Sequence, residues 1–171
     1  GNKAENPFGT IVGKNAFFRA IGELEKVEFE GECSISEAVT GSADRGSNDG
    51  LTVIITDFFT DNDWKKAVDY LCYKKRQGIL LQVLSPEEKD PSYSGRVNLI
   101  DAESGSLDDA RNLRLRITRS RLLAYEEAMR DMTEGIKEFS TSRGVDFISV
   151  SCDQPIEKML FGELLKVGIM G

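Results

Sequence analysis

Hydrophobic residues along this chain form continuous runs that alternate with helical stripes. Three mainly apolar runs, at residues 51–56, 79–84 and 145–150, carry one charge between them, Asp146, and are typical of parallel strands covered on both faces. Apolar residues at intervals of three and four predict helices from Lys14, from Asp61 or Asp63 to before Gly78, over about 120–140, and from Asp153. The pattern therefore predicts a three-layer α/β fold with a mainly parallel sheet.

Shorter segments complete this expectation. Ser34 stands three residues before Glu37, the spacing of a capping box, and predicts a short helix through Val39 followed by a loop over 41–50. Two short strands at 97–101 and 113–118 predict an added β-hairpin. The remaining expectations are an extended piece at 26–30, an acidic loop at 87–91, an irregular segment at 1–12 and one domain at 13–171.

Composition narrows the classes of function. The 171 residues carry 22 basic and 29 acidic side chains, a net charge of −7, which argues against a nucleic-acid binder. The lack of histidine excludes Ser-His and Cys-His catalysis and histidine-ligated zinc. We expect no membrane contact, because no apolar stretch is long enough for a span and no signal peptide is recognisable. Cys33, Cys72 and Cys152 are expected to be buried or idle thiols in the reducing cytoplasm.

Acidic residues supply the candidate sites. Asp57 directly follows a predicted parallel strand, at the sheet edge where α/β folds bind ligands, and its carboxylate suits either a hard cation or a helix cap. Asp101 and Glu103, with Glu87 and Glu88, could hold a metal or pair as acid and base, although solvated loop charges are the favoured explanation. Cys152 has no histidine to activate it and is expected to be inert.

The order of several short segments resembles a known family. The chain resembles the von Willebrand factor A-like domains and, more narrowly, the bacterial domain-of-unknown-function family fifty-eight, over about Gly13 to Gly171. The segments that carry the resemblance are 53–58, 84–88, 97–105, Tyr125, 143–147 and the closing helix from Asp153. The family implies a doubly wound α/β sheet and a protein-binding module that acts beside MoxR-type AAA ATPases in protein assembly or maturation.

The resemblance also implies a departure at the family's metal site. Asp57 matches its last ligand, but the threonine position falls at Cys33, with Ser34 the nearest hydroxyl, and the Asp-x-Ser-x-Ser loop is absent. Cysteine is a poor Mg²⁺ ligand, so Mg²⁺ would require that loop from elsewhere. We therefore expect a truncated domain, the C-terminal part only, that lacks the first strands. Its strand at 51–56 would then be an apolar edge, covered by a second copy or by the N-terminal segment.

Two functions remain open from the sequence. The first is a non-catalytic interaction module that binds through Asp57 and Ser34, with an AAA ATPase as partner, homodimerisation through Leu51–Thr56 and no cofactor. The alternative is a metal-assisted hydrolase that uses Asp57, Asp101 and Glu103.

Overall fold

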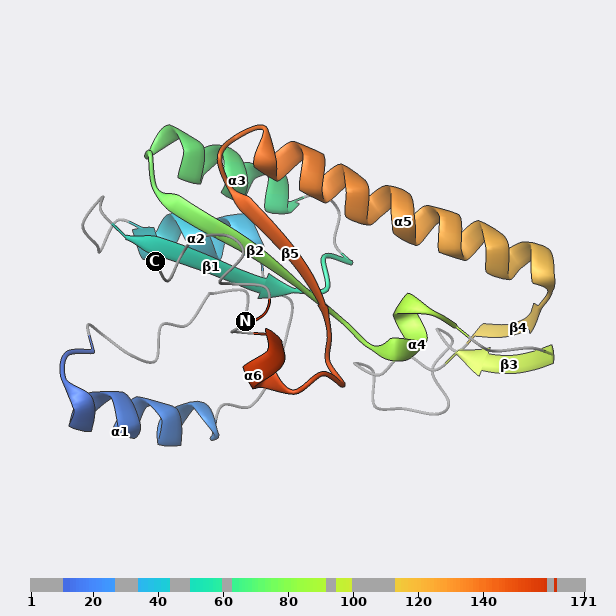
Figure 1. The fold of residues 1–171 in the computed structure, drawn as a ribbon, viewed down its shortest axis with the longest axis horizontal. Coiled ribbons are helices and arrows are strands. Elements are labelled where there is room, and N and C mark those ends of the chain that lie inside the picture. Colours follow the sequence, from blue (N-terminus) through green and yellow to red (C-terminus); the bar gives the residue numbers. More distant parts are fainter. Residues whose placement is uncertain are drawn as a thin grey trace. The chain divides into compact units, whose positions relative to one another are not determined.

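The structure is a computed structural model that describes residues 11–26, 34–43, 50–59, 63–91, 95–99, 113–159 and 162. Its elements alternate along the chain as the sequence predicts (Figure 1). In order they are α1 (Lys14–Leu24), α2 (Ile35–Ala43), β1 (Leu51–Thr56), α3 (Asp63–Tyr73), β2 (Gln77–Leu84), α4 (Pro86–Lys89), β3 (Gly95–Leu99), β4 (Leu113–Ile117), α5 (Arg119–Thr141), β5 (Asp146–Ser151) and α6 (Ile156–Met159).

Contacts along the chain divide it into two compact units. The first consists of Gly1–Thr52 and Phe58–Gly78, and the second of Val53–Asp57 and Ile79–Gly171.

The second unit is built on a parallel sheet. Its strand order is β1-β2-β5, and β2 pairs with β5 in parallel from Ile79↔Asp146 to Leu84↔Ser151. The helix α5 packs against β5, and β3 pairs antiparallel with β4. The predicted α/β fold with a mainly parallel sheet and an added hairpin is therefore confirmed.

The central strand β2 carries most of the described sheet's buried apolar surface. Ile79, Leu80 and Leu84 are almost inaccessible, and Ile79 and Leu81 form a cluster with Ile148 and Val150 of β5. Burial of one such side chain stabilises the fold by about 1.5–3 kcal/mol. The runs at 79–84 and 145–150 are therefore buried strands, as predicted.

The strand β1 differs from the prediction that it is covered on both faces. Ile54 is buried, but Leu51, Val53 and Ile55 are 43%, 45% and 65% exposed. β1 is the outermost strand in the order of the described sheet, so its side chains have a neighbouring strand on one side only. A continuous apolar run does not by itself distinguish a central strand from an edge strand.

The first unit holds α1, α2 and α3. The helix α3 buries Trp64, Ala67, Val68 and Leu71, and it packs against α2. Cys72 was expected on this buried side but is exposed, since it stands one residue past Leu71 and thus about 100° around the helix from it. Cys152 is exposed as well, so neither of these two thiols is buried.

Two predicted loops are partly helical. The helix α2 continues to Ala43, so residues 41–43 do not belong to the loop predicted over 41–50. The predicted acidic loop begins with the one-turn helix α4, whose first turn is a complete capping box: Ser85 Oγ accepts from the Glu88 N–H at 3.1 Å, and Glu88 Oε2 accepts from the Ser85 N–H at 2.7 Å. The Ser85 to Glu88 spacing signals this box in the sequence.

The ends of α5 also follow from local chemistry. Thr118 Oγ1 accepts from the Arg121 N–H at 3.4 Å and caps the first turn. Gly144 adopts a φ of 71°, a conformation that side chains disfavour, and allows the Val145 N–H to bond the Ser140 carbonyl at 3.0 Å. The helix therefore stops where the glycine predicts.

Several predictions lie outside the described residues. They concern the segment 1–10, the extended piece from 27 to 30, Cys33, the loop residues 44–49, the connection 100–112 with Asp101 and Glu103, and the last helix beyond Met159 apart from Gly162.

Candidate functional site

Asp57 lies where a binding residue of an α/β fold is expected. It follows β1 at the carboxyl end of the parallel sheet, and its side chain is exposed. The hydroxyl of Thr56 is 3.5 Å from Asp57 Oδ1. Asp57 is therefore presented outward from the second unit.

A buried glutamine fixes the main chain of Asp57. Gln82 in β2 is fully buried, and its Nε2 donates to the Asp57 carbonyl at 3.4 Å. Its Oε1 accepts from Thr133 Oγ1 of α5 at 3.3 Å. A buried amide is stable only when such partners satisfy it. Gln82 thus links the end of β1 to α5, a role that the sequence analysis missed because a lone polar residue in a buried run carries no sign of its partners.

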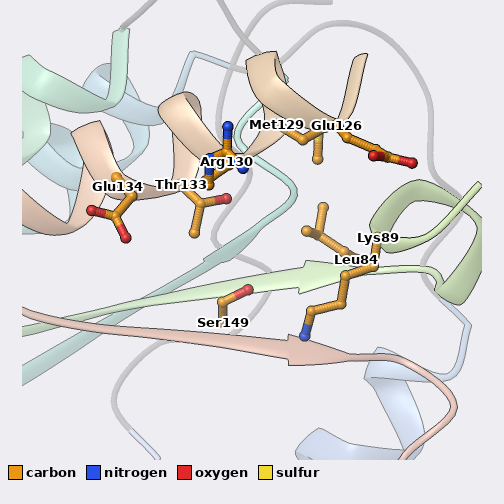
Figure 2. Close-up of a pocket in the computed structure, with 8 residues that line it drawn as sticks. All are labelled: Leu84, Lys89, Glu126, Met129, Arg130, Thr133, Glu134 and Ser149. Carbon is orange, nitrogen blue, oxygen red and sulfur yellow. The ribbon is translucent and has the colours of Figure 1, made fainter. Parts of the chain in front are cut away.

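A shallow groove lies between α5 and the sheet, with a volume of about 230 Å³. Figure 2 shows Ser149 of β5 pointing toward α5, below a helix surface that carries Arg130, Thr133 and Glu134. Leu84, Lys89, Glu126 and Met129 complete the lining. Tyr125 donates to the Glu88 carbonyl at 3.0 Å and joins α5 to α4, and burial, with the charge of Glu88, raises the pKa of Tyr125. The groove carries charges of both signs, so its electrostatics favour no single class of ligand.

Ser34 has a structural role in the first unit. Its Oγ accepts from the Glu37 N–H at 3.1 Å, which confirms that Ser34 caps α2. The same hydroxyl donates to Asp63 Oδ2 at 2.8 Å. Asp63 also accepts from the Ser36 N–H at 2.9 Å and from Ser36 Oγ at 2.6 Å, so the first residue of α3 closes the N-terminus of α2.

These bonds perturb the Asp63 carboxyl group. The hydroxyl and then the backbone N–H of Ser36 lower the pKa of Asp63 below its ordinary value of 3.8, burial opposes them, and Ser34 and Lys66 add to the lowering. The carboxylate oxygens are engaged by protein donors. This arrangement makes Asp63 a structural residue that fastens α2 to α3.

A cation site needs several ligand side chains close together. The described residues contain no group of three or more histidine, cysteine, aspartate or glutamate side chains that could hold a metal ion. Mg²⁺ requires near-octahedral oxygen coordination, which Asp57 alone does not supply. No helix among the described residues is long and apolar enough to cross a bilayer.

The most extensive exposed apolar surface of the first unit lies on α1. Phe17 and Phe18 are 55% and 59% exposed, and Ile21 and Leu24 are also exposed. Ala20 is the buried residue of this helix. The helical spacing of these residues predicts the helix correctly, but spacing does not reveal whether a stripe is covered.

Comparison with known proteins identifies the family. The profile described as "Protein of unknown function DUF58" matches residues 1–134. The crystal structure of conserved hypothetical protein BatB from Bacteroides thetaiotaomicron superimposes with a TM-score of 0.50 at 16% identity, over 89% of this chain and 69% of that chain. At this identity the likeness shows a shared fold. No curated protein matches the chain. Because the profile covers well over half of the sequence, the chain belongs to the DUF58 family.

Proposed function

We propose that this chain is a non-catalytic protein-interaction module of von Willebrand factor A type. The observation that carries the proposal is the exposed apolar face of α1, which consists of Phe17, Phe18, Ile21 and Leu24. Clustered apolar residues on a surface are typical of sites where another protein docks. Phenylalanine pairs such as Phe17 and Phe18, whose rings meet edge to face at 5.8 Å, present a large contact area with few rotatable bonds.

The build of α1 supports this assignment. An isolated helix of 11 residues is marginally stable in water, so its stability depends on packing of its apolar side. In this helix the small residue Ala20 is buried, whereas the four large apolar residues stay exposed. A partner that covers them would recover the hydrophobic free energy that the first unit leaves unused.

The family resemblance indicates the partner to test first. We propose a MoxR-type AAA ATPase, with a role in the assembly or maturation of other proteins. A cytoplasmic location agrees with the free, exposed thiols of Cys72 and Cys152, which persist in a reducing compartment. The cation site around Asp57 stays incomplete in this proposal.

The test compares two sets of substitutions within the first unit. Purified wild-type chain and the double variant Phe17→Ser/Leu24→Ser are titrated against the MoxR-type ATPase of the same organism by biolayer interferometry. The control is Tyr73→Ser on α3, which removes an apolar residue that is 81% exposed. We expect the α1 variant to bind at least about tenfold more weakly, since buried aromatic anchors dominate interfaces, and the control to bind as the wild type does.

Two results would contradict the proposal. Wild-type affinity of the α1 variant would exclude α1 as the docking face, and no binding by the wild type would exclude the ATPase. A calorimetric titration with Mg²⁺ and Mn²⁺ addresses the cation site. Sub-micromolar binding that is lost in Asp57→Ala would show a complete metal site and reopen the case for metal-assisted chemistry.

A further inference from the structure

We propose that the outer side of α3 and the turn that ends it bind a short acidic segment of another protein. This surface, termed the basic patch, consists of Lys66, Tyr70, Tyr73, Lys74 and Lys75. All five residues lie in the first unit. The patch shares no residue with the α1 face, so binding of the acidic segment and binding of the ATPase succeed or fail separately.

Helical geometry gathers the patch on one side of α3. Lys66, Tyr70 and Tyr73 lie within about 60° of one another around the helix, because successive residues turn by about 100°. The other side of the helix carries its buried residues, Trp64, Ala67, Val68 and Leu71. Tyr73 is 81% exposed, and its hydroxyl can donate to a carboxylate. The Lys74 Nζ lies over the Tyr70 ring, 5.6 Å from its centroid, so cationic and aromatic groups stand side by side.

The backbone of Lys75 is the unusual feature of the patch. Its φ is 54°, in the left-handed region that side chains disfavour. The Lys75 N–H donates to the Cys72 carbonyl at 3.0 Å. The Arg76 N–H donates to the Leu71 carbonyl, also at 3.0 Å. Lys75 therefore occupies the position just beyond a helix at which glycine is usual.

The end of α5 shows the same pair of hydrogen bonds with glycine in place. Gly144 has a φ of 71°, and its N–H donates to the Thr141 carbonyl at 3.0 Å. The Val145 N–H donates to the Ser140 carbonyl at the same distance. Lys75 thus places a positive charge, at a cost in stability, where α5 has no side chain. A residue held in a disfavoured conformation is typical of a functional surface, so we attribute the lysine to its charge.

The distribution of charge selects an acidic segment as the occupant. Residues 63–77 carry five basic and two acidic side chains, a local net charge of +3 in a chain whose net charge is −7. The helix dipole favours cations at the end of α3 but disfavours Lys66 in its first turn, so the dipole does not account for the patch. A short acidic segment responds to the local charge, because screening acts within about 10 Å at 0.1 M salt. A long polyanion such as a nucleic acid would also meet the remaining residues, which together carry −10.

Fluorescence anisotropy tests the proposal. The probe is a fluorescein-labelled short peptide of alternating aspartate and glutamate, titrated with the purified chain at low and at high salt. We expect saturable binding that weakens as salt rises, and no binding of the matching peptide of asparagine and glutamine. A wild type that binds neither peptide, or both equally, would overturn the proposal. Tighter binding of a single-stranded oligonucleotide of equal charge would overturn the assignment of the occupant.

Substitutions at Lys75 separate its charge from its role in the turn. Lys75→Gly relieves the backbone and removes the charge, so it should raise the melting temperature by about 2–4 °C yet weaken peptide binding at least about threefold. Lys75→Arg keeps the charge and should bind as the wild type does. The matched control Lys137→Gln removes an exposed charge from α5 and should leave peptide binding unchanged. Wild-type affinity of Lys75→Gly, or an equal loss in Lys137→Gln, would refute the basic patch as the binding site.

Discussion

Replacement of Asp63 with alanine removes the group that closes the N-terminus of α2. In the folded chain the Asp63 carboxylate accepts from Ser34 Oγ and from both the hydroxyl and the N–H of Ser36. The substitution removes the acceptor of these hydrogen bonds. Water reaches the half-buried site and replaces part of the lost bonding, and Ser34 still accepts from the Glu37 N–H. The variant therefore reports what a carboxylate from one helix contributes to the start of another.

The size of the effect follows from the number and exposure of these bonds. Loss of a helix cap typically costs about 1 kcal/mol, and a hydrogen bond to a charged group contributes about 1.5–3 kcal/mol. The three bonds share one carboxylate and are not additive, so we expect Asp63→Ala to lower the free energy of unfolding by about 2 kcal/mol at neutral pH. Asp63→Asn keeps one acceptor oxygen and should lose about half as much.

The pKa of Asp63 gives the prediction its pH dependence. Because the hydrogen bonds lower the pKa below 3.8 in the folded state, the carboxylate contributes fully above that value and loses its contribution as the pH falls through the folded pKa. The difference between wild type and Asp63→Ala should therefore shrink between neutral pH and about pH 3. The control Glu25→Gln at the end of α1 alters an exposed carboxylate of the same unit and should show little effect at either pH.

The assay uses the single tryptophan of the chain. Trp64 is buried beside Asp63, and its ring meets that of Phe58 edge to face at 5.9 Å, so its fluorescence reports unfolding of the first unit. Urea titrations of the variants give the free energies. A loss below about 0.5 kcal/mol for Asp63→Ala at neutral pH, or a loss that does not diminish in acid, would refute the reasoning.

Two further predictions concern the second unit. Gln82→Leu removes the hydrogen-bond partner of Thr133 and should lower the free energy of unfolding by about 1–2 kcal/mol. The double variant with Thr133→Val should lose less than the sum of the two single losses. Urea unfolding followed by circular dichroism measures these losses, and strict additivity would argue against the Gln82 bridge. Gly144→Ala should cost about 1 kcal/mol because φ is 71°, and a higher melting temperature would contradict this. Gly135→Ala inside α5, where a new Cβ meets no atom within 4 Å, should stabilise by about 0.5–1 kcal/mol, and a lower melting temperature would contradict that.

Local signals in the sequence account for what could be predicted. The helices that begin at Ser34 and Thr118 and the stop at Gly144 depend on residues a few positions apart, so spacing alone reveals them. The capping box of Ser85 and Glu88 is also local. The acidic loop predicted at 87–91 was wrong for residues 87–89, which lie in α4 after Pro86 at its first position.

Residues far apart in the sequence account for what could not be predicted. Asp61 or Asp63 was expected to begin the helix that contains Trp64. The Asp63 carboxylate instead serves α2, which starts 28 residues earlier at Ile35. Gln82 meets Thr133 across 51 residues. Such pairs form when helices and strands pack, and a single sequence carries no period or spacing that encodes them.

The sequence by itself therefore determined the order and type of the described helices and strands apart from α4, because backbone preference and hydrophobic periodicity act within a few residues. Only the tertiary structure decided which apolar faces are covered. β1 was predicted to be covered on both faces, yet Leu51, Val53 and Ile55 are exposed, and so is the apolar stripe on α1. Burial depends on which elements lie alongside, and that is fixed by contacts between distant parts of the chain.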